Sequence, residues 1–156
     1  MKVLIIEDDH IASELLKILI ETSFKRLFST IETSETYEDS LEKIIASKPD
    51  LVFLDLNLKG KDAFDLLKLK STHSFETVII TADDKKAYQA IKHQVLDYLI
   101  KPITIGDLSD SIQKFVLKRI ENPPSCSRTK IKLANPNGFF LIEHDEIVFC
   151  EACGNH

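Results

Sequence analysis

Short aliphatic runs alternate along the chain with longer segments of helical periodicity, and this alternation limits the fold more than any other feature. The runs at residues 3–6, 51–54 and 78–80 are unbroken, as in strands that are covered on both faces. A weaker strand candidate spans residues 28–33, and another spans 98–100. Strands that alternate with helices predict a parallel sheet with helical crossovers.

The segments between these runs space their apolar residues as helices do. Residues 66–69 and 87–91 give weak helical patterns. The clearer apolar faces are at Ile11, Leu15, Ile18 and Leu19, at Tyr37, Leu41, Ile44 and Ile45, and at Leu108, Ile112, Phe115, Val116 and Ile120. We therefore predict an α/β fold over residues 1–121, a (βα)5 doubly wound parallel five-stranded sheet, followed by a short β-rich C-terminal segment.

The pattern changes after residue 121. Residues 122–128 contain two prolines and small polar side chains, which is the composition of a linker. Residues 130–133, 139–142 and 146–150 are strand candidates, with a turn predicted at 135–138. So few strands without a helix cannot close a sheet of any size. Residues 129–156 therefore predict the beginning of a second, all-β domain.

Composition narrows the function classes. The 156 residues are 44% hydrophobic, enough for one good core and an appendage. The formal net charge of -5 argues against a broad cationic surface for nucleic acid. No apolar run reaches the roughly 18–20 residues of a membrane span, and the start runs into acidic residues, so we expect a cytoplasmic protein. Cys126, Cys150 and Cys153 are odd in number and crowded at one end, which argues against a disulfide framework.

Polar residues follow the predicted strands where each strand ends. In an open parallel α/β sheet, ligands bind at the carboxyl ends of the strands. The residues expected there are Glu7, Asp8, Asp9, Asp55, Thr81, Ala82, Lys101 and Pro102. Carboxylates gathered in one pocket repel each other unless a cation neutralises them, and Mg²⁺ accepts such oxygen ligands. A carboxylate beside the metal can attack phosphorus and form an aspartyl phosphate.

The motifs Ile-Ile-Glu-Asp-Asp, Val-Phe-Leu-Asp-Leu-Asn-Leu, Ile-Ile-Thr-Ala and Asp-Tyr-Leu-Ile-Lys-Pro occur in that order. Together they resemble the receiver domains of two-component response regulators, over about the first 121 residues. The resemblance implies that Asp55 is the phosphoacceptor and that a sensor histidine kinase supplies the phosphoryl group. It implies a Mg²⁺ site formed by Glu7, Asp8, Asp55 and the backbone carbonyl of Asn57. It assigns phosphoryl binding and switching to Thr81, Ala82, Lys101 and Tyr98, and makes Lys101–Pro102 a candidate cis peptide.

Two places depart from the commonest family pattern. Glu7 stands where the first acid is most often Asp, which should lengthen a water-mediated reach to the metal. Leu58 and Lys59 replace the usual Met-Pro, and Ala63 replaces a later Gly. These departures leave the loop shape and the phosphoryl lifetime open.

The tail resembles the opening portion of LytTR-type DNA-binding domains through the run Asp-Glu-Ile-Val-Phe-Cys-Glu-Ala-Cys-Gly-Asn at residues 145–155. The resemblance implies that residues 129–156 are an N-terminal fragment of such a domain. A longer parent protein would then regulate transcription, and DNA would be bound only by the complete output domain.

Other interpretations stay open. A stand-alone phosphorelay receiver is the main alternative, although the strand-rich tail tells against it. The acidic residues could be solvated caps, Thr81 could be a helix N-cap before Asp83 and Asp84, and Tyr98 could simply be packed. A surface including Ala87, Ala90, Ile91 and Tyr98 could form a homodimer on phosphorylation or face solvent.

An enzyme or a cofactor carrier on the same architecture is a third class. A flavin or nucleotide site would need a Gly-, Ser- or Thr-rich loop after the first strand, and the acids there would repel phosphate. A zinc or redox role for Cys150 and Cys153 lacks the second pair of ligands that such a site usually has. We expect no enzyme activity beyond self-phosphorylation and self-dephosphorylation.

Overall fold

The computed structural model describes residues 1–58, 61–83, 86–122, 131–135 and 138–142, which fall in two compact units, Met1–Ile120 and Glu121–His156. The first unit contains a five-stranded parallel sheet in the order β2-β1-β3-β4-β5. Its strands are β1 (Lys2–Ile6), β2 (Thr30–Ser34), β3 (Leu51–Leu54), β4 (Glu76–Thr81) and β5 (Asp97–Ile100). The predicted doubly wound fold is confirmed.

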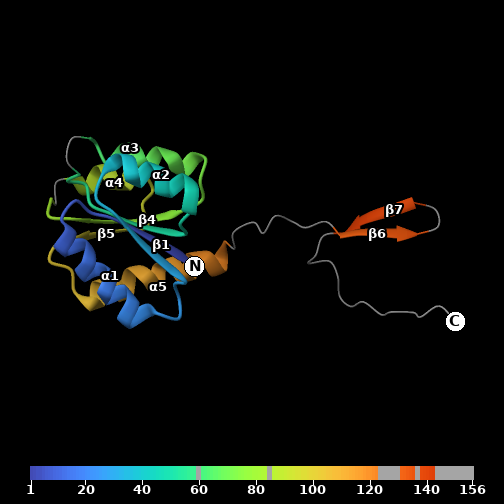
Figure 1. Cartoon of the computed structure of the whole chain (residues 1–156), viewed down its shortest axis with the longest axis horizontal. Coiled ribbons are helices and arrows are strands. Elements are labelled where there is room, and N and C mark those ends of the chain that lie inside the picture. The colour runs from blue at the N-terminus through green and yellow to red at the C-terminus, as the bar shows by residue number, and fades with distance from the viewer. Residues whose placement is uncertain (59–60, 84–85, 123–130, 136–137, 143–156) are drawn as a thin grey trace. The chain divides into compact units, whose positions relative to one another are not determined.

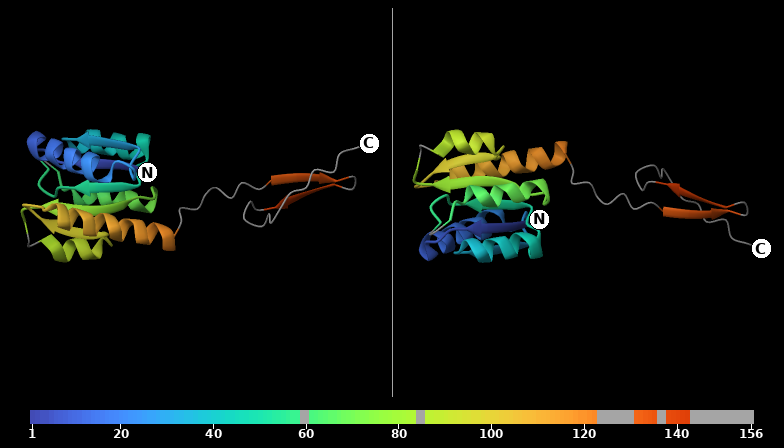
Figure 2. Two further views of the ribbon diagram at one scale, coloured as in Figure 1. Left: turned by 90° about the horizontal axis from the view of Figure 1, so that it is seen from below. Right: turned by 90° about the horizontal axis from the view of Figure 1, so that it is seen from above.

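Helices cover both faces of this sheet (Figure 1). They are α1 (His10–Phe24), α2 (Tyr37–Ser47), α3 (Phe64–Leu67) with the 3-10 turn η1 (Lys68–Ser71), α4 (Ala87–Lys92) and α5 (Ile105–Glu121). Helices α1 and α5 lie on one face, and α2, α3 and α4 lie on the other. The turned views in Figure 2 show the same two layers of helices about the strands.

The core consists of two clusters, one on each face of the sheet. Along β1, Val3 and Ile5 belong to the cluster under α1 and α5, while Leu4 and Ile6 belong to the cluster under α2, α3 and α4. Because successive strand residues point to opposite faces, a strand covered on both sides is apolar throughout. This explains why most of β1, all of β3 and the middle of β4 are unbroken apolar runs in the sequence.

Of the four apolar residues that mark the predicted face of α1, Leu19 packs partly against the core, but the fully buried positions are others. Its buried residues are Ser13, Leu16 and Ile20, whereas Ile11, Leu15 and Ile18 are 71%, 58% and 52% exposed. Both sets have helical spacing, so periodicity alone does not say which one meets the sheet. Ser13 concealed the true core face because it is polar, yet it is 1% exposed.

Smaller differences concern single residues. Phe28 precedes β2 instead of opening it, and its ring stacks on Phe115 of α5 with centroids 6.4 Å apart. Ala90, named for a dimer surface, is 1% exposed and belongs to the core, whereas Ile91 is 73% exposed. Ala90 faces inward because α4 packs one side of its short length on the sheet.

The second unit contains the antiparallel pair β6 (Ile131–Asn135) and β7 (Gly138–Ile142). These strands agree with the candidates at residues 130–133 and 139–142. Residues 123–128 of the linker predicted at 122–128, the strand candidate at 146–150 and all three cysteines lie outside the described residues. Among the helices of the described part, none has the length and apolar character needed to cross a membrane.

Candidate functional site

The acidic residues meet at the carboxyl edge of the sheet, between β1 and β3. Glu7 and Asp8 directly follow β1, and Asp55 directly follows β3. The backbone N–H of Asp55 donates to the carbonyl of Ile6 at 2.9 Å, which continues the strand pairing into the site. The strand order reverses its direction between β1 and β3, so this edge is the topological switch point at which such sheets bind ligands.

These acids could hold a metal ion. Glu7, Asp8 and Asp55 each offer a carboxylate oxygen, and the three oxygens lie within 4.8 Å of one another. Glu7 and Asp55 are buried, at 5% and 4% exposed. Mg²⁺ prefers such hard oxygen donors and needs only one or two carboxylates from the protein, because it keeps several waters. The donor set therefore fits the expected ion.

Asp9, the third acid after β1, has a separate structural role. Its carboxylate accepts hydrogen bonds from the backbone N–H groups of Ile11 and Ala12, at 2.9 and 3.2 Å. It is the N-cap of α1, which satisfies donors that have no partner inside the helix. Asp9 is thus a helix cap, whereas Glu7 and Asp55 are buried and do not fit the interpretation as solvated caps.

Lys101, which directly follows β5, places its ammonium between two of these acids. Its Nζ lies 2.6 Å from Glu7 Oε2 and 2.6 Å from Asp55 Oδ2. Burial raises the pKa of Glu7, and the nearby charge of Asp55 adds to this, against the opposing effect of Lys101. Burial alone would lower the pKa of Lys101, but its hydrogen bonds to Asp55 and Glu7 outweigh burial and raise that pKa. Lys101 is therefore a charged partner of the acidic edge.

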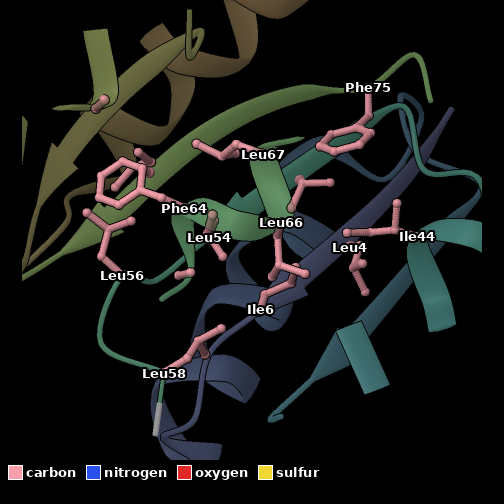
Figure 3. Packing of buried hydrophobic residues seen from close by; sticks show 14 residues of the cluster. Leu4, Ile6, Ile44, Leu54, Leu56, Leu58, Phe64, Leu66, Leu67 and Phe75 are labelled. Carbon is pink, nitrogen blue, oxygen red and sulfur yellow. The ribbon is translucent and has the colours of Figure 1, made fainter. Parts of the chain in front are cut away.

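The loop after β3 alternates buried and site-facing residues. Leu54, Leu56 and Leu58 are 1%, 4% and 5% exposed, and all three belong to the core cluster drawn in Figure 3. Asp55 and Asn57 stand between them. Leu56 and Leu58, which follow the strand, anchor the loop because they are buried. The start of the loop is therefore held in place even though Leu58 replaces the usual Met.

The side chain of Asn57 was missed by sequence reasoning, which assigned a role only to its carbonyl. Its amide Nδ2 donates to Thr81 Oγ1 at 3.4 Å, and its backbone N–H donates to Asp55 Oδ1 at 3.0 Å. The two-residue alternation of leucines with Asp55 and Asn57 was the signal that could have placed both polar residues on one side.

Thr81 ends β4 and is 0% exposed. Its hydroxyl accepts a hydrogen bond from the backbone N–H of Asp83 at 3.3 Å. Thr81 is not the N-cap of α4, because α4 begins at Ala87 and its cap position is Lys86. The buried hydroxyl is thus held at the edge of the sheet by the loop that follows it.

The remaining predicted residues surround this edge. Tyr98 on β5 is partly buried, and its hydroxyl donates to the carbonyl of Asp83. Ala82 follows Thr81 and is exposed. The Lys101–Pro102 peptide bond is cis. The structure therefore brings Glu7, Asp8, Asp55, Asn57, Thr81 and Lys101 to one edge, with Tyr98 linked to it through the loop after Thr81.

A five-stranded parallel sheet of this order, with an acidic cluster and a lysine at its carboxyl edge, defines the flavodoxin-like receiver class. The family model described as "Response regulator receiver domain" matches residues 3–113. The chain belongs to this family of two-component signalling proteins. In keeping with the fold, the response regulatory domain of protein mrkE from Klebsiella pneumoniae superposes with a TM-score of 0.67 at 28% identity, covering 78% of this chain and 100% of that one.

Curated relatives carry names of the LytT and LytR type. The sensory transduction protein LytT of Bacillus cereus is 29% identical over 161 residues, covering 96% of this chain and 65% of its own length. The sensory transduction protein LytR of Staphylococcus haemolyticus is 35% identical over 117 residues, or 73% of this chain and 44% of its own length. The chain thus spans less than two thirds of either relative. The match to the Bacillus cereus protein covers 96% of the chain, so the similarity continues past residue 121 into the C-terminal segment.

Proposed function

We propose that this chain is a phosphorylation switch in which Asp55 accepts a phosphoryl group from the phosphohistidine of a sensor kinase. The supporting observation is the convergence of Glu7, Asp8, Asp55 and Lys101 on one buried edge of a receiver fold. Such clusters suit chemistry in which positioning and charge stabilisation supply most of the rate.

In the proposed step, a carboxylate oxygen of Asp55 attacks phosphorus while the bond from phosphorus to the donor nitrogen breaks. The electron pair of that bond stays on the imidazole nitrogen, which takes a proton from solvent. Glu7, Asp8, Asp55 and the backbone carbonyl of Asn57 would hold Mg²⁺, which would offset the charge of the phosphoryl oxygens. Lys101 would exchange its contact with Asp55 for a phosphoryl oxygen, and the Thr81 hydroxyl would donate to another.

A small-molecule donor tests this proposal. Incubation with acetyl phosphate and Mg²⁺ should add one phosphoryl group to the intact mass. Chelation of the metal should prevent the addition, and Asp55→Asn should prevent it without unfolding the chain. If the Asp55→Asn variant still gained a phosphoryl group, the assignment of Asp55 would be wrong. No adduct on the folded parent chain under any condition would indicate a receiver that works by binding alone.

We also propose that residues 1–121 are the receiver, 122–128 a linker, and 129–156 the start of a LytTR-type DNA-binding domain. The observation in favour is the LytT match that extends into the tail. In the longer protein, phosphorylation in the cytoplasm would regulate transcription, with homodimerisation as one route. A gel-shift assay should find no DNA binding by this chain, and binding only when a complete output domain is attached.

A further inference from the structure

Asn57 contacts both Asp55 and Thr81, and it does so through two different groups. Its backbone N–H bonds Asp55 Oδ1 at 3.0 Å, and its side-chain amide bonds Thr81 Oγ1 at 3.4 Å. The backbone of Asn57 already has a role in the proposed site, through its carbonyl, whereas the side chain has none. Substitution of the side chain leaves the backbone groups in place, so the two roles can be separated by experiment.

The hydroxyl oxygen of Thr81 accepts two hydrogen bonds. A hydroxyl has two acceptor lone pairs and one proton to donate. The amide of Asn57 and the backbone N–H of Asp83 occupy the acceptor positions, at 3.4 and 3.3 Å. The proton is therefore directed away from these two donors. Thr81 is 0% exposed, so bulk water does not compete for that proton.

The position of the Asn57 backbone is set by its neighbours. Leu56 and Leu58 on either side are 4% and 5% exposed and belong to the core cluster of Figure 3. Asn57 itself is exposed. Burial of the two leucines fixes the backbone position of Asn57. The hydrogen bond to Thr81 then orients the side-chain amide.

We propose that the Asn57 amide is a positioning residue that orients the Thr81 hydroxyl proton toward the phosphoryl group accepted by Asp55. This rests on the proposed function of Asp55. A pre-oriented hydroxyl donates to the incoming phosphoryl oxygen without first turning, which favours the transition state over the resting state. The amide of Asn57 therefore speeds phosphoryl uptake through Thr81 and does not touch the phosphoryl group itself.

Two substitutions separate the hydrogen bond from the space that the side chain fills. Asn57→Ala removes the donor and most of the volume, while Asn57→Leu keeps a similar volume without a donor. Uptake from acetyl phosphate at saturating Mg²⁺, followed by intact mass, should be about three- to tenfold slower in both variants, as for the loss of one hydrogen bond. Normal uptake by Asn57→Leu would overturn the proposal, because volume would then suffice.

A double-substitution cycle tests whether Asn57 acts through Thr81. In a Thr81→Ala background, Asn57→Ala should cause no further slowing, because the hydroxyl that it positions is already gone. Equal slowing in both backgrounds would assign Asn57 a merely structural role and refute the inference. The Mg²⁺ affinity of Asn57→Ala, measured by titration, should stay within about twofold of the parent, since the backbone carbonyl remains; a larger loss would move the effect to the metal site.

Lys61 supplies a matched control in the same loop. It pairs with Glu38 at 2.6 Å and is 51% exposed, and Lys61→Ala should leave uptake unchanged. Slowing by Lys61→Ala as large as that by Asn57→Ala would count against a specific role for the amide. If the folded parent chain gained no phosphoryl group at all, the proposed function itself would fail, whereas uptake by the parent with unaltered rates in the Asn57 variants would reject this inference alone.

Discussion

Lys101 balances part of the charge that β1 and β3 bring together at the edge of the sheet. When ionised, Glu7, Asp8 and Asp55 carry three negative charges, and the Lys101 ammonium offsets one of them. The two negative charges left over equal the charge of one divalent cation. The charge of the cluster thus suits the proposed ion, and Lys101 pairs with two of the three acids.

This arrangement predicts that a divalent ion can stand in for the missing lysine. Lys101→Met leaves Glu7 and Asp55 buried without their cation, which should lower the free energy of unfolding by about 3 kcal/mol, the lower end for breaking a buried pair. Addition of Mg²⁺ should stabilise this variant more than it stabilises the parent. Urea unfolding with EDTA and with Mg²⁺ measures both effects.

Lys114→Met is the control for that prediction, because it breaks an ion pair with Asp97 in which the Lys114 side chain is 54% exposed. Such pairs contribute at most about 1 kcal/mol, and Mg²⁺ should add nothing beyond its effect on the parent. Equal stabilisation of Lys101→Met and of the parent by Mg²⁺ would mean that Lys101 does not share ligands with the ion.

Helix α5 is held to the opposite edge of the sheet by three ion pairs. Arg119 pairs with Asp50 ahead of β3, Lys118 pairs with Glu76 at the start of β4, and Lys114 pairs with Asp97 at the start of β5. The acids lie at the amino ends of three neighbouring strands, and the cations lie along the last turns of the helix. These pairs connect α5 to three strands, in addition to its buried apolar face.

Asp97 gives one of these contacts a pH dependence. Burial alone would raise the pKa of Asp97, but hydrogen bonds from Lys114 at 2.8 Å, from Ser111 at 2.5 Å and from the Tyr98 backbone outweigh burial and hold that pKa below its ordinary value of 3.8. A lowered pKa in the folded state stabilises the fold above the unfolded value, and this contribution is lost as the pH falls through the folded pKa.

Asp97→Asn should therefore be less stable than the parent by about 1 kcal/mol at pH 6, for a partly exposed charged contact. The difference should shrink as the pH falls below 3.8. Urea midpoints of the two proteins at a series of pH values provide the measurement. A difference that stays constant down to pH 3 would show that the charge of Asp97 is not what stabilises this junction.

Helices and strands could be predicted from the sequence where burial requires a regular pattern of apolar residues. Strand β3 was predicted at Leu51–Leu54, where the structure has it, because a strand covered on both faces must be apolar throughout. The inner face of α1 was not predictable, because Ser13 faces the core while Ile11 faces out. The contact of Asn57 with Thr81 was also missed, since it joins side chains 24 positions apart and the alternation after β3 names no partner for Asn57.

At the scale of the whole molecule, the first unit has its own core on both faces of its sheet. Among the residues whose burial the structure describes, the buried members of both clusters lie between β1 and α5. A unit with a complete core needs no contribution from residues that follow it. The tail, by contrast, contributes an antiparallel pair of strands, and two strands alone are marginal in water.

A fragment of residues 1–121 should therefore fold by itself. Its free energy of unfolding in urea should lie within about 1 kcal/mol of that of the 156-residue chain, as expected when no core residue is removed. Circular dichroism at increasing urea concentration makes the comparison. A fragment that failed to unfold cooperatively would show that the boundary after residue 121 is misplaced.

Asp55 is proposed to carry the phosphoryl group, and a chemical reaction can identify the phosphorylated residue. Borohydride reduces an aspartyl phosphate to homoserine, releasing phosphate, and leaves ordinary carboxylates unchanged. After treatment with acetyl phosphate and Mg²⁺, borohydride reduction and peptide sequencing should find homoserine at position 55. Homoserine at position 8 instead, or at no position in a chain that had gained phosphoryl mass, would contradict the account.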